Sequence, residues 1–272
     1  MSDYQVFEGK PEQFYMDRVL IVNLQRAKDA IKKDWDMIFA VDGDEGSGKS
    51  VLAQQMGFYC DPTLTVDRIT FNDKEFRKAI MDATQYQCVI YDEAYTGLGS
   101  RSTMSLINRT LVSMLAEIRQ KNLFVFIVMP SFFDLDKYVA LHRSRALIHV
   151  YTMNSFERGY FAFYNKDKKK SIYITGKKYY NYGNVRKTSN FSGRFTNHYC
   201  ISEKEYRKKK HDSLNEREAN REKVEHIREV EEELFTRVML LGDDIPHKLR
   251  MSLTGLPQST YFLKLKKWRE SQ

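Results

Sequence analysis

The stretch Gly43-Asp44-Glu45-Gly46-Ser47-Gly48-Lys49-Ser50 fits the pattern G-x-x-x-x-G-K-[ST] at every fixed position. This pattern is typical of a phosphate-binding loop, because its glycines adopt backbone angles that aim successive N–H groups at an anion. In such a loop the lysine reaches the terminal phosphates of a nucleotide, and the next hydroxyl binds Mg²⁺. We therefore expect these eight residues and Val51 to bind a nucleoside triphosphate, with Lys49 as the catalytic cation and Ser50 as a metal ligand.

The residues around the loop predict the strand and the helix that such a loop requires. Residues 37–41 are all apolar, which indicates a buried strand. Residues 50–59 place Val51, Leu52 and Met56 on one apolar helix face, and the start of this helix adds its positive end to the loop. A fortuitous glycine turn, the alternative, would not need this context.

A second acidic motif supplies the carboxylate that a nucleotide-bound metal requires. The apolar run at residues 88–91 ends in Asp92-Glu93, the pattern of a Walker B strand. We expect Asp92 to bind Mg²⁺, directly or through water, and Glu93 to polarise the water that attacks the γ-phosphate. The alternative is a strand that ends in a solvated acidic pair. The glutamate favours an ATPase over a GTPase switch.

The next elements extend the predicted sheet. An amphipathic helix over residues 104–121 leads into the apolar run 123–129, which is typical of a parallel strand. Ser131 follows it and is a candidate sensor of the γ-phosphate, or else a cap of the next helix. Residues 134–145 predict a helix and residues 146–151 another strand. The predicted fold class is α/β, a P-loop NTPase with a mainly parallel sheet.

Several arginines near this core are candidates for a finger that neutralises transition-state charge in a neighbouring subunit. The catalytic candidates are Arg119, Arg143 and Arg145, and Arg101 and Arg109 are further possibilities. For each one the alternative is an ordinary surface or helix-end cation.

The motifs together resemble the FtsK/HerA superfamily of P-loop ATPases. The resemblance covers about residues 35–151 and rests on the P-loop, Ile90-Tyr91-Asp92-Glu93, the helix end at residues 117–122 and Leu135-Asp136-Lys137. It extends to phage proteins of the zonular-occludens-toxin type. The resemblance implies a homo-oligomeric ring, a pentamer or hexamer, with ATP between subunits and DNA in the middle. Family members often have Gln where this chain has Met129-Pro130-Ser131.

Charge is distributed unevenly along the 272 residues. The net charge is +8, yet residues 1–150 carry −2, residues 151–210 carry +11 and residues 211–272 carry −1. A basic block of this kind indicates a polyanion partner. The start of the chain lacks a signal-peptide pattern, the longest apolar run is too short to span a bilayer, and three dispersed cysteines suggest a reducing compartment. We expect a cytoplasmic protein of a prokaryotic host cell, or one associated with a virion.

The basic block combines lysines with tyrosines and phenylalanines. Residues 160–164 and 171–174 predict two strands around a basic turn at residues 165–170. Lysines would bind DNA phosphates and aromatic rings would stack on bases, unless they are a solvated rim and strand core. The predicted contacts are Lys168, Lys169, Lys170, Lys177 and Lys178. A nuclease is not expected, because Glu157 and Asp167 are the only acidic residues between 151 and 200.

The last seventy residues predict a helical region. Residues 203–241 mix Glu with Lys and Arg in the manner of a solvated connecting helix. Residues 242–272 predict a helix, a glycine turn and a second basic helix, the order of a helix-turn-helix. Its second helix would present Gln258, Ser259 and Tyr261 to base edges and Lys264 and Lys267 to phosphates. The alternative is a helical hairpin for oligomer contacts.

The sequence thus predicts four regions: an ATPase core at 1–151, a basic aromatic β-rich extension at 152–202, the connecting helix at 203–241 and the tail at 242–272. The leading hypothesis is an ATP- and Mg²⁺-dependent motor that translocates or packages DNA for a phage, virus or mobile element. Capsid, portal or replication proteins are its expected protein partners. The alternatives are an ATP-switched DNA-binding protein for replication initiation, partition or regulation, and a phage morphogenesis or export ATPase.

Overall fold

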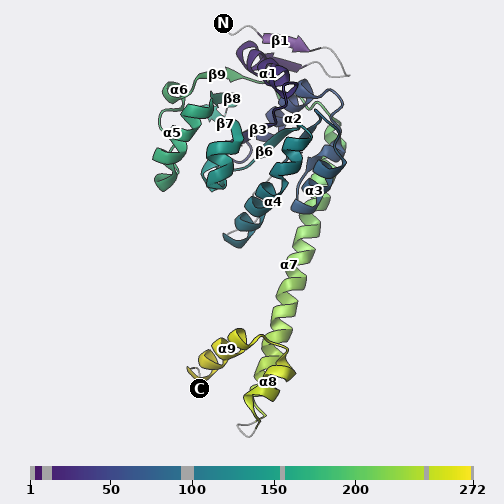
Figure 1. The fold of residues 1–272 in the computed structure, drawn as a ribbon, viewed down its shortest axis with the longest axis vertical. Helices are drawn as coiled ribbons and strands as arrows, with labels where there is room; N and C mark the ends of the chain where they lie inside the picture. The colour runs from purple at the N-terminus through teal and green to yellow at the C-terminus, as the bar shows by residue number, and fades with distance from the viewer. Residues whose placement is uncertain (1–3, 8–13, 93–100, 154–156, 242–244, 271–272) are drawn as a thin grey trace. The chain divides into compact units, whose positions relative to one another are not determined.

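The structure is a computed structural model that describes residues 4–7, 14–92, 101–153, 157–241 and 245–270. The chain divides into two compact units, Met1–Lys210 and His211–Gln272. The first unit is α/β and the second is helical (Figure 1). Helix α7, Glu203–Met239, begins in the first unit and continues into the second, which confirms the predicted long charged helix.

A seven-stranded sheet forms the centre of the first unit, in the order β4-β5-β6-β3-β7-β8-β9. The strands from β4 to β7 are parallel, whereas β8 and β9 run antiparallel to their neighbours. The predicted α/β class with a mainly parallel sheet is therefore confirmed. The strand bounds are β3 Met37–Gly43, β4 Ile69–Thr70, β5 Cys88–Tyr91, β6 Phe124–Val128, β7 Ser144–Met153, β8 Glu157–Tyr164 and β9 Phe191–Arg194; a separate hairpin pairs β1 Tyr4–Phe7 with β2 Phe14–Asp17.

Helices cover both faces of this sheet, as Figure 1 shows. Phe39 and Val41 of β3 pack on the face that carries α1 (Arg18–Ile31) and α2 (Lys49–Cys60). Ile38 and Ala40 pack on the opposite face, with α3 (Asp73–Asp82) and α4 (Arg101–Gln120). A strand buried on both faces has to be apolar at every position, which explains the unbroken apolar runs in the sequence.

The carboxyl ends of three strands meet at one edge of the sheet. Strand β3 lies between β6 and β7, and β6 separates it from β5. Val41 is level with Val128 and Tyr91 is level with Ile127, so β3, β5 and β6 end together. In open α/β sheets ligands bind outside the carboxyl ends of the strands, near such a change in strand order. The glycine-rich loop follows β3, and Asp92 follows β5.

Two predicted elements were wrong. Residues 165–174 do not form a turn and a strand, because Asn165 caps helix α5 (Lys166–Gly176) by accepting a hydrogen bond from the backbone N–H of Lys168. Its buried residues recur at helical spacing: Lys169, Ile172, Tyr173 and Gly176. Residues 134–145 also lack the predicted continuous helix: a 3₁₀ turn ends at Asp134, a π-helical turn spans residues 139–143, and β7 already begins at Ser144.

The basic block is not separate from the core sheet. Strand β8 pairs with β7, and β9 pairs with β8, so the sheet of the first unit continues past residue 151 into the basic block. Two short helical turns, η5 (Lys177–Tyr179) and α6 (Val185–Thr188), lie between α5 and β9.

The second unit packs the end of α7 against α8 (His247–Thr254) and α9 (Gln258–Glu270). Its core contains Phe235, Val238, Met239, Tyr261 and Leu265. Gly255 ends α8 with a φ of 65°, a left-handed conformation that favours glycine. The order of helix, glycine turn and helix is as predicted, and DNA binding by this unit stays a prediction. Among the helices of the described residues, none is both long and apolar enough to cross a bilayer.

Candidate active site

The glycine-rich loop connects β3 to α2 in a conformation that needs its glycines. Gly43, Gly46 and Gly48 have φ values of 136°, 73° and 101°. A Cβ atom on Gly43 would lie 1.9 Å from the carbonyl oxygen of Val150, so a larger residue cannot occupy this position. Gly48 caps α2, whose first turn has no acidic residue. The first N–H groups of this helix therefore offer a positive end to an anion.

Ser47 supplies an independent indication that the loop fits a phosphate. Its side chain is completely buried, and its hydroxyl has no hydrogen-bond partner among the described residues. A buried polar group without a partner costs free energy. A phosphate oxygen bound inside the loop would satisfy this hydroxyl.

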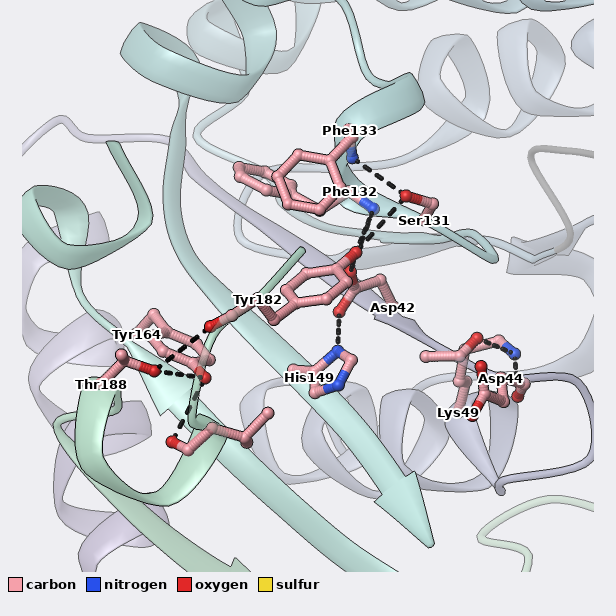
Figure 2. A network of polar contacts seen from close by, with 12 residues as sticks. Asp42, Asp44, Lys49, Ser131, Phe132, Phe133, His149, Tyr164, Tyr182 and Thr188 are labelled. Atoms are coloured by element: carbon pink, nitrogen blue, oxygen red, sulfur yellow. Dashed lines mark hydrogen bonds and ion pairs between the residues drawn. The ribbon is translucent and has the colours of Figure 1, made fainter. Parts of the chain in front are cut away.

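Lys49 is the first residue of α2, directly after the loop glycine Gly48. Its Nζ donates to the carbonyl oxygens of Gly43 and Asp44, at 2.7 and 2.6 Å (Figure 2). Burial lowers the pKa of Lys49, and the negative charges of Asp42 and Asp92 oppose this effect. Two neutral carbonyls compete weakly with a charged phosphate, so the ammonium group is well placed to move to a nucleotide.

The two halves of the predicted metal site meet. The Ser50 hydroxyl donates to Oδ1 of Asp92 at 2.9 Å, although the residues are 42 positions apart. Asp92 is completely buried. Its second oxygen, Oδ2, accepts a hydrogen bond of 2.6 Å from the hydroxyl of Tyr206, in the first turn of α7. Burial and the charge of Asp92 hold the pKa of Tyr206 far above its ordinary value, so the phenol stays a donor.

A buried carboxylate directly before the loop organises a polar network, shown in Figure 2. Asp42 has no exposed surface and accepts hydrogen bonds from the Phe132 N–H at 3.0 Å and from the Tyr182 hydroxyl. His149 Nδ1 lies 3.0 Å from the same carboxylate, and its ring stacks on Tyr182. Burial alone would lower the pKa of His149, but the charge and hydrogen bond of Asp42 raise it overall.

Ser131 joins this network as a cap. Its Oγ accepts a hydrogen bond from the Phe133 N–H at 3.3 Å and lies 3.4 Å from the Tyr182 hydroxyl. The structure thus shows the capping role, on the 3₁₀ turn Phe132–Asp134. A role for Ser131 in sensing the γ-phosphate stays a prediction.

The three catalytic arginine candidates lie away from the loop within this chain. Arg119 pairs with Asp34 at 2.9 Å, and Arg143 and Arg145 both pair with Asp36. The two aspartates precede β3, whereas the loop follows it. Seven strand residues, or about 23 Å, separate the two ends. Within the chain these arginines are therefore structural, and action on another copy stays a prediction.

Three further candidates near the core remain predictions. Glu93, the predicted water-polarising residue, lies outside the described residues, so its role stays a prediction. Arg109 is exposed on α4. Arg101 is the first residue of the same helix.

The predicted DNA-contacting lysines differ in accessibility. The prediction that Lys169 contacts phosphates was wrong. Its side chain is fully buried, and its ammonium group donates to the carbonyl oxygen of Ala140. Burial, with the charges of Lys170 and Lys166, lowers the pKa of Lys169 to about 7. Lys177 and Lys178 are exposed, and each ammonium group lies over a tyrosine ring.

The predicted recognition helix is also only partly exposed. Tyr261 is fully buried in the core of the second unit, and its hydroxyl lies 2.9 Å from Nδ1 of His247, so the prediction that it contacts bases was wrong. Lys264 is paired with Glu232 at 2.7 Å. Gln258, Ser259 and Lys267 are exposed.

Sequence reasoning missed four residues of the site: Asp42, His149, Tyr182 and Tyr206. The polar Asp42, between a buried strand and a glycine loop, was the one local indication of a buried network. The other three reach the site from positions 107 to 140 residues away from their partners. No motif spacing predicts such contacts.

No protein-family model matches the chain, and a search of curated proteins finds no match.

Proposed function

We propose that the chain is a Mg²⁺-dependent ATPase. The observation that carries this proposal is the contact between Ser50 and Asp92 at the end of the glycine-rich loop. A loop of this sequence has a specific use in binding phosphates, and a buried carboxylate bonded to its hydroxyl is the expected partner of a metal ion.

Each group of the proposed site then has a distinct role. The backbone N–H groups and the Ser47 hydroxyl bind phosphate oxygens, and Lys49 neutralises the terminal phosphates. Ser50 and Asp92 would hold Mg²⁺, which when bound supplies positive charge to the phosphate oxygens. Glu93 orients the attacking water.

We further propose that ATP hydrolysis acts on DNA. The support is the charge of +11 on residues 151–210, which belong to the same unit as the loop and include strands β8 and β9 of its sheet. A ring of subunits and movement of DNA, implied by the resemblance to FtsK/HerA ATPases, complete the leading proposal. An ATP-switched DNA-binding protein is the second candidate, favoured by the exposed Gln258, Ser259 and Lys267 of α9.

The central test compares ATP hydrolysis by the purified chain and three variants. Lys49→Ala and Asp92→Asn should each reduce the rate at least about a hundredfold. Lys32→Ala, which removes an exposed lysine at the end of α1, should hydrolyse ATP at the unaltered rate. Equal rates for Lys49→Ala and the unaltered chain would sink the ATPase proposal.

A second experiment separates the motor from the switch. Hydrolysis is measured with and without DNA, and movement is measured by displacement of a third strand from a duplex. Stimulated hydrolysis with strand displacement supports the motor. Binding to DNA with negligible turnover and no displacement supports the switch.

A further inference from the structure

The first unit contains a pocket of about 550 Å³ beside α5, in the basic aromatic block. Helix α5 forms one wall, and the segment from η5 to α6 forms the other. The lining residues that carry the argument are Lys168, Gly176, Tyr179, Tyr182, Lys187 and Thr188.

The lining combines three kinds of group that together recognise a nucleotide. Lys168 and Lys187 provide positive charge, Tyr179 and Tyr182 provide aromatic rings, and hydroxyl and amide side chains provide hydrogen bonds. The lining residues include no acidic side chain. Phosphates bind cations, and bases stack on aromatic rings.

Close contacts fix the inner walls of the pocket. A Cβ atom on Gly176 would lie 2.1 Å from the carbonyl oxygen of Asn181, so the end of α5 and the facing segment meet backbone to backbone. Lys168 is held by a hydrogen bond of 2.6 Å to the carbonyl oxygen of Ser189. The Thr188 hydroxyl donates to the carbonyl oxygen of Asn184 at 2.9 Å.

The outer part of the pocket is accessible by contrast. The side chain of Tyr179 is 72% exposed, and Lys187 is exposed as well. An exposed ring and an exposed ammonium group that line the same pocket offer it a stacking surface and a phosphate contact. The Lys178 ammonium group lies 5.1 Å from the centre of the Tyr179 ring, and this cation–π contact helps to hold the ring in place.

We propose that this pocket binds one unstacked nucleotide of a single-stranded nucleic acid, with Tyr179 stacking on the base and Lys187 contacting the phosphate. The inference rests on the proposed function only in taking nucleic acid as the substrate. A duplex fits less well, because its bases are stacked inside and present no free face to the tyrosine.

Tyr182 connects this pocket to the loop that carries the proposed ATPase site. It lines the pocket, its carbonyl oxygen faces Thr188, and its hydroxyl donates to Asp42, the residue before Gly43 (Figure 2). A nucleic acid strand bound in the pocket would therefore contact Tyr182, which also supports the end of β3 through Asp42.

The test measures binding of a fluorescent oligothymidylate of about 16 nucleotides by anisotropy, without ATP. Tyr179→Ala and Lys187→Ala should each weaken binding about tenfold, the loss expected for one stacked base or one phosphate contact. The matched control is Lys166→Ala, which removes an exposed lysine of α5 that does not line the pocket, and should change affinity less than about twofold.

The salt dependence and competitors complete the test. Lys187→Ala should reduce the slope of log affinity against log salt by about one, and Lys166→Ala should not. Equal losses of affinity in all three variants, or no loss in Tyr179→Ala and Lys187→Ala, would overturn the proposal. Thymidine monophosphate that competes as well as the oligonucleotide would show a free-nucleotide site instead. The pocket variants should bind duplex DNA unaltered, because stacked bases present no free face to Tyr179, and an equal loss of duplex binding would overturn the single-strand proposal. Binding losses in a chain without ATPase activity would support the pocket and refute the proposed hydrolysis.

Discussion

The phenol of Tyr206 donates a hydrogen bond of 2.6 Å to Oδ2 of Asp92, and the Ser50 hydroxyl binds the other oxygen of the same carboxylate. Both oxygens of the proposed metal ligand are therefore oriented, one from the loop and one from the first turn of α7. A ligand oriented in this way has less freedom to lose when a metal binds.

Removal of the Tyr206 hydroxyl should weaken the metal site. In Tyr206→Phe the Mg²⁺ concentration for half-maximal ATP hydrolysis should rise about tenfold. The free energy of unfolding, measured in urea, should fall by about 2 kcal/mol because a buried carboxylate loses a donor. The control is Tyr199→Phe, whose ring contacts Tyr206 at a centroid distance of 5.5 Å. An equal effect of both changes on Mg²⁺ would contradict a positioning role.

Asp42 should control the charge of His149. The raised pKa of His149 means that the folded protein holds the proton more tightly than the unfolded chain. The resulting stability is complete below the ordinary value of 6.5 and is lost as the pH rises through the higher folded-state value. In Asp42→Asn the pKa of His149, followed by NMR, should fall, and stability should vary less as the pH rises above 6.5.

The control for this prediction is Asp44→Asn. Asp44 also raises the pKa of His149 through its charge, without a hydrogen bond to the ring, so its removal should have the smaller effect. A pKa that is unchanged in Asp42→Asn would show that another group stabilises the imidazolium.

Two glycines of the loop should differ in their tolerance of alanine. Gly43→Ala places a methyl group 1.9 Å from the Val150 oxygen and should lower the free energy of unfolding by more than about 3 kcal/mol. Gly46→Ala meets only the Arg158 side chain at 3.5 Å, so its cost should be about 1–2 kcal/mol, from the left-handed backbone. Urea unfolding compares the two, and similar losses would contradict the described path of the loop.

Arg143 should be needed for stability. Its partner Asp36 is only 1% exposed, so Arg143→Ala leaves a buried carboxylate with Arg145 as its remaining salt-bridge partner, at 3.4 Å. The free energy of unfolding should fall by about 3 kcal/mol. Arg119→Ala should cost much less, because Arg119 and Asp34 form a solvated pair. A stable Arg143→Ala protein would return this arginine to the candidates for a finger.

The sequence predicted those parts of the structure that depend on local order. The strand before the loop, the helix after it and the acidic residue at the end of β5 follow from apolar runs and from fixed motif spacing, and the contact of Ser50 with Asp92 agrees with them. Residues 165–174 were misread because an alternating pattern of isoleucines resembles a strand, and the cap provided by Asn165 outweighs it. Tyr206, His149 and Tyr182 reach the site through tertiary contacts, which a linear pattern does not encode.

The first turns of α7 are fastened to the first unit at two levels. Tyr206 holds Asp92, and one turn later the Lys209 ammonium group donates to the carbonyl oxygens of Val66 and Ile69, at 3.0 and 2.6 Å. Thermodynamic linkage is reciprocal: if a metal ion at Asp92 strengthens or weakens the bond to Tyr206, the docking of this helix must alter metal affinity by the same factor. Metal binding at the end of β5 and the docking of the first turns of α7 are thus energetically coupled.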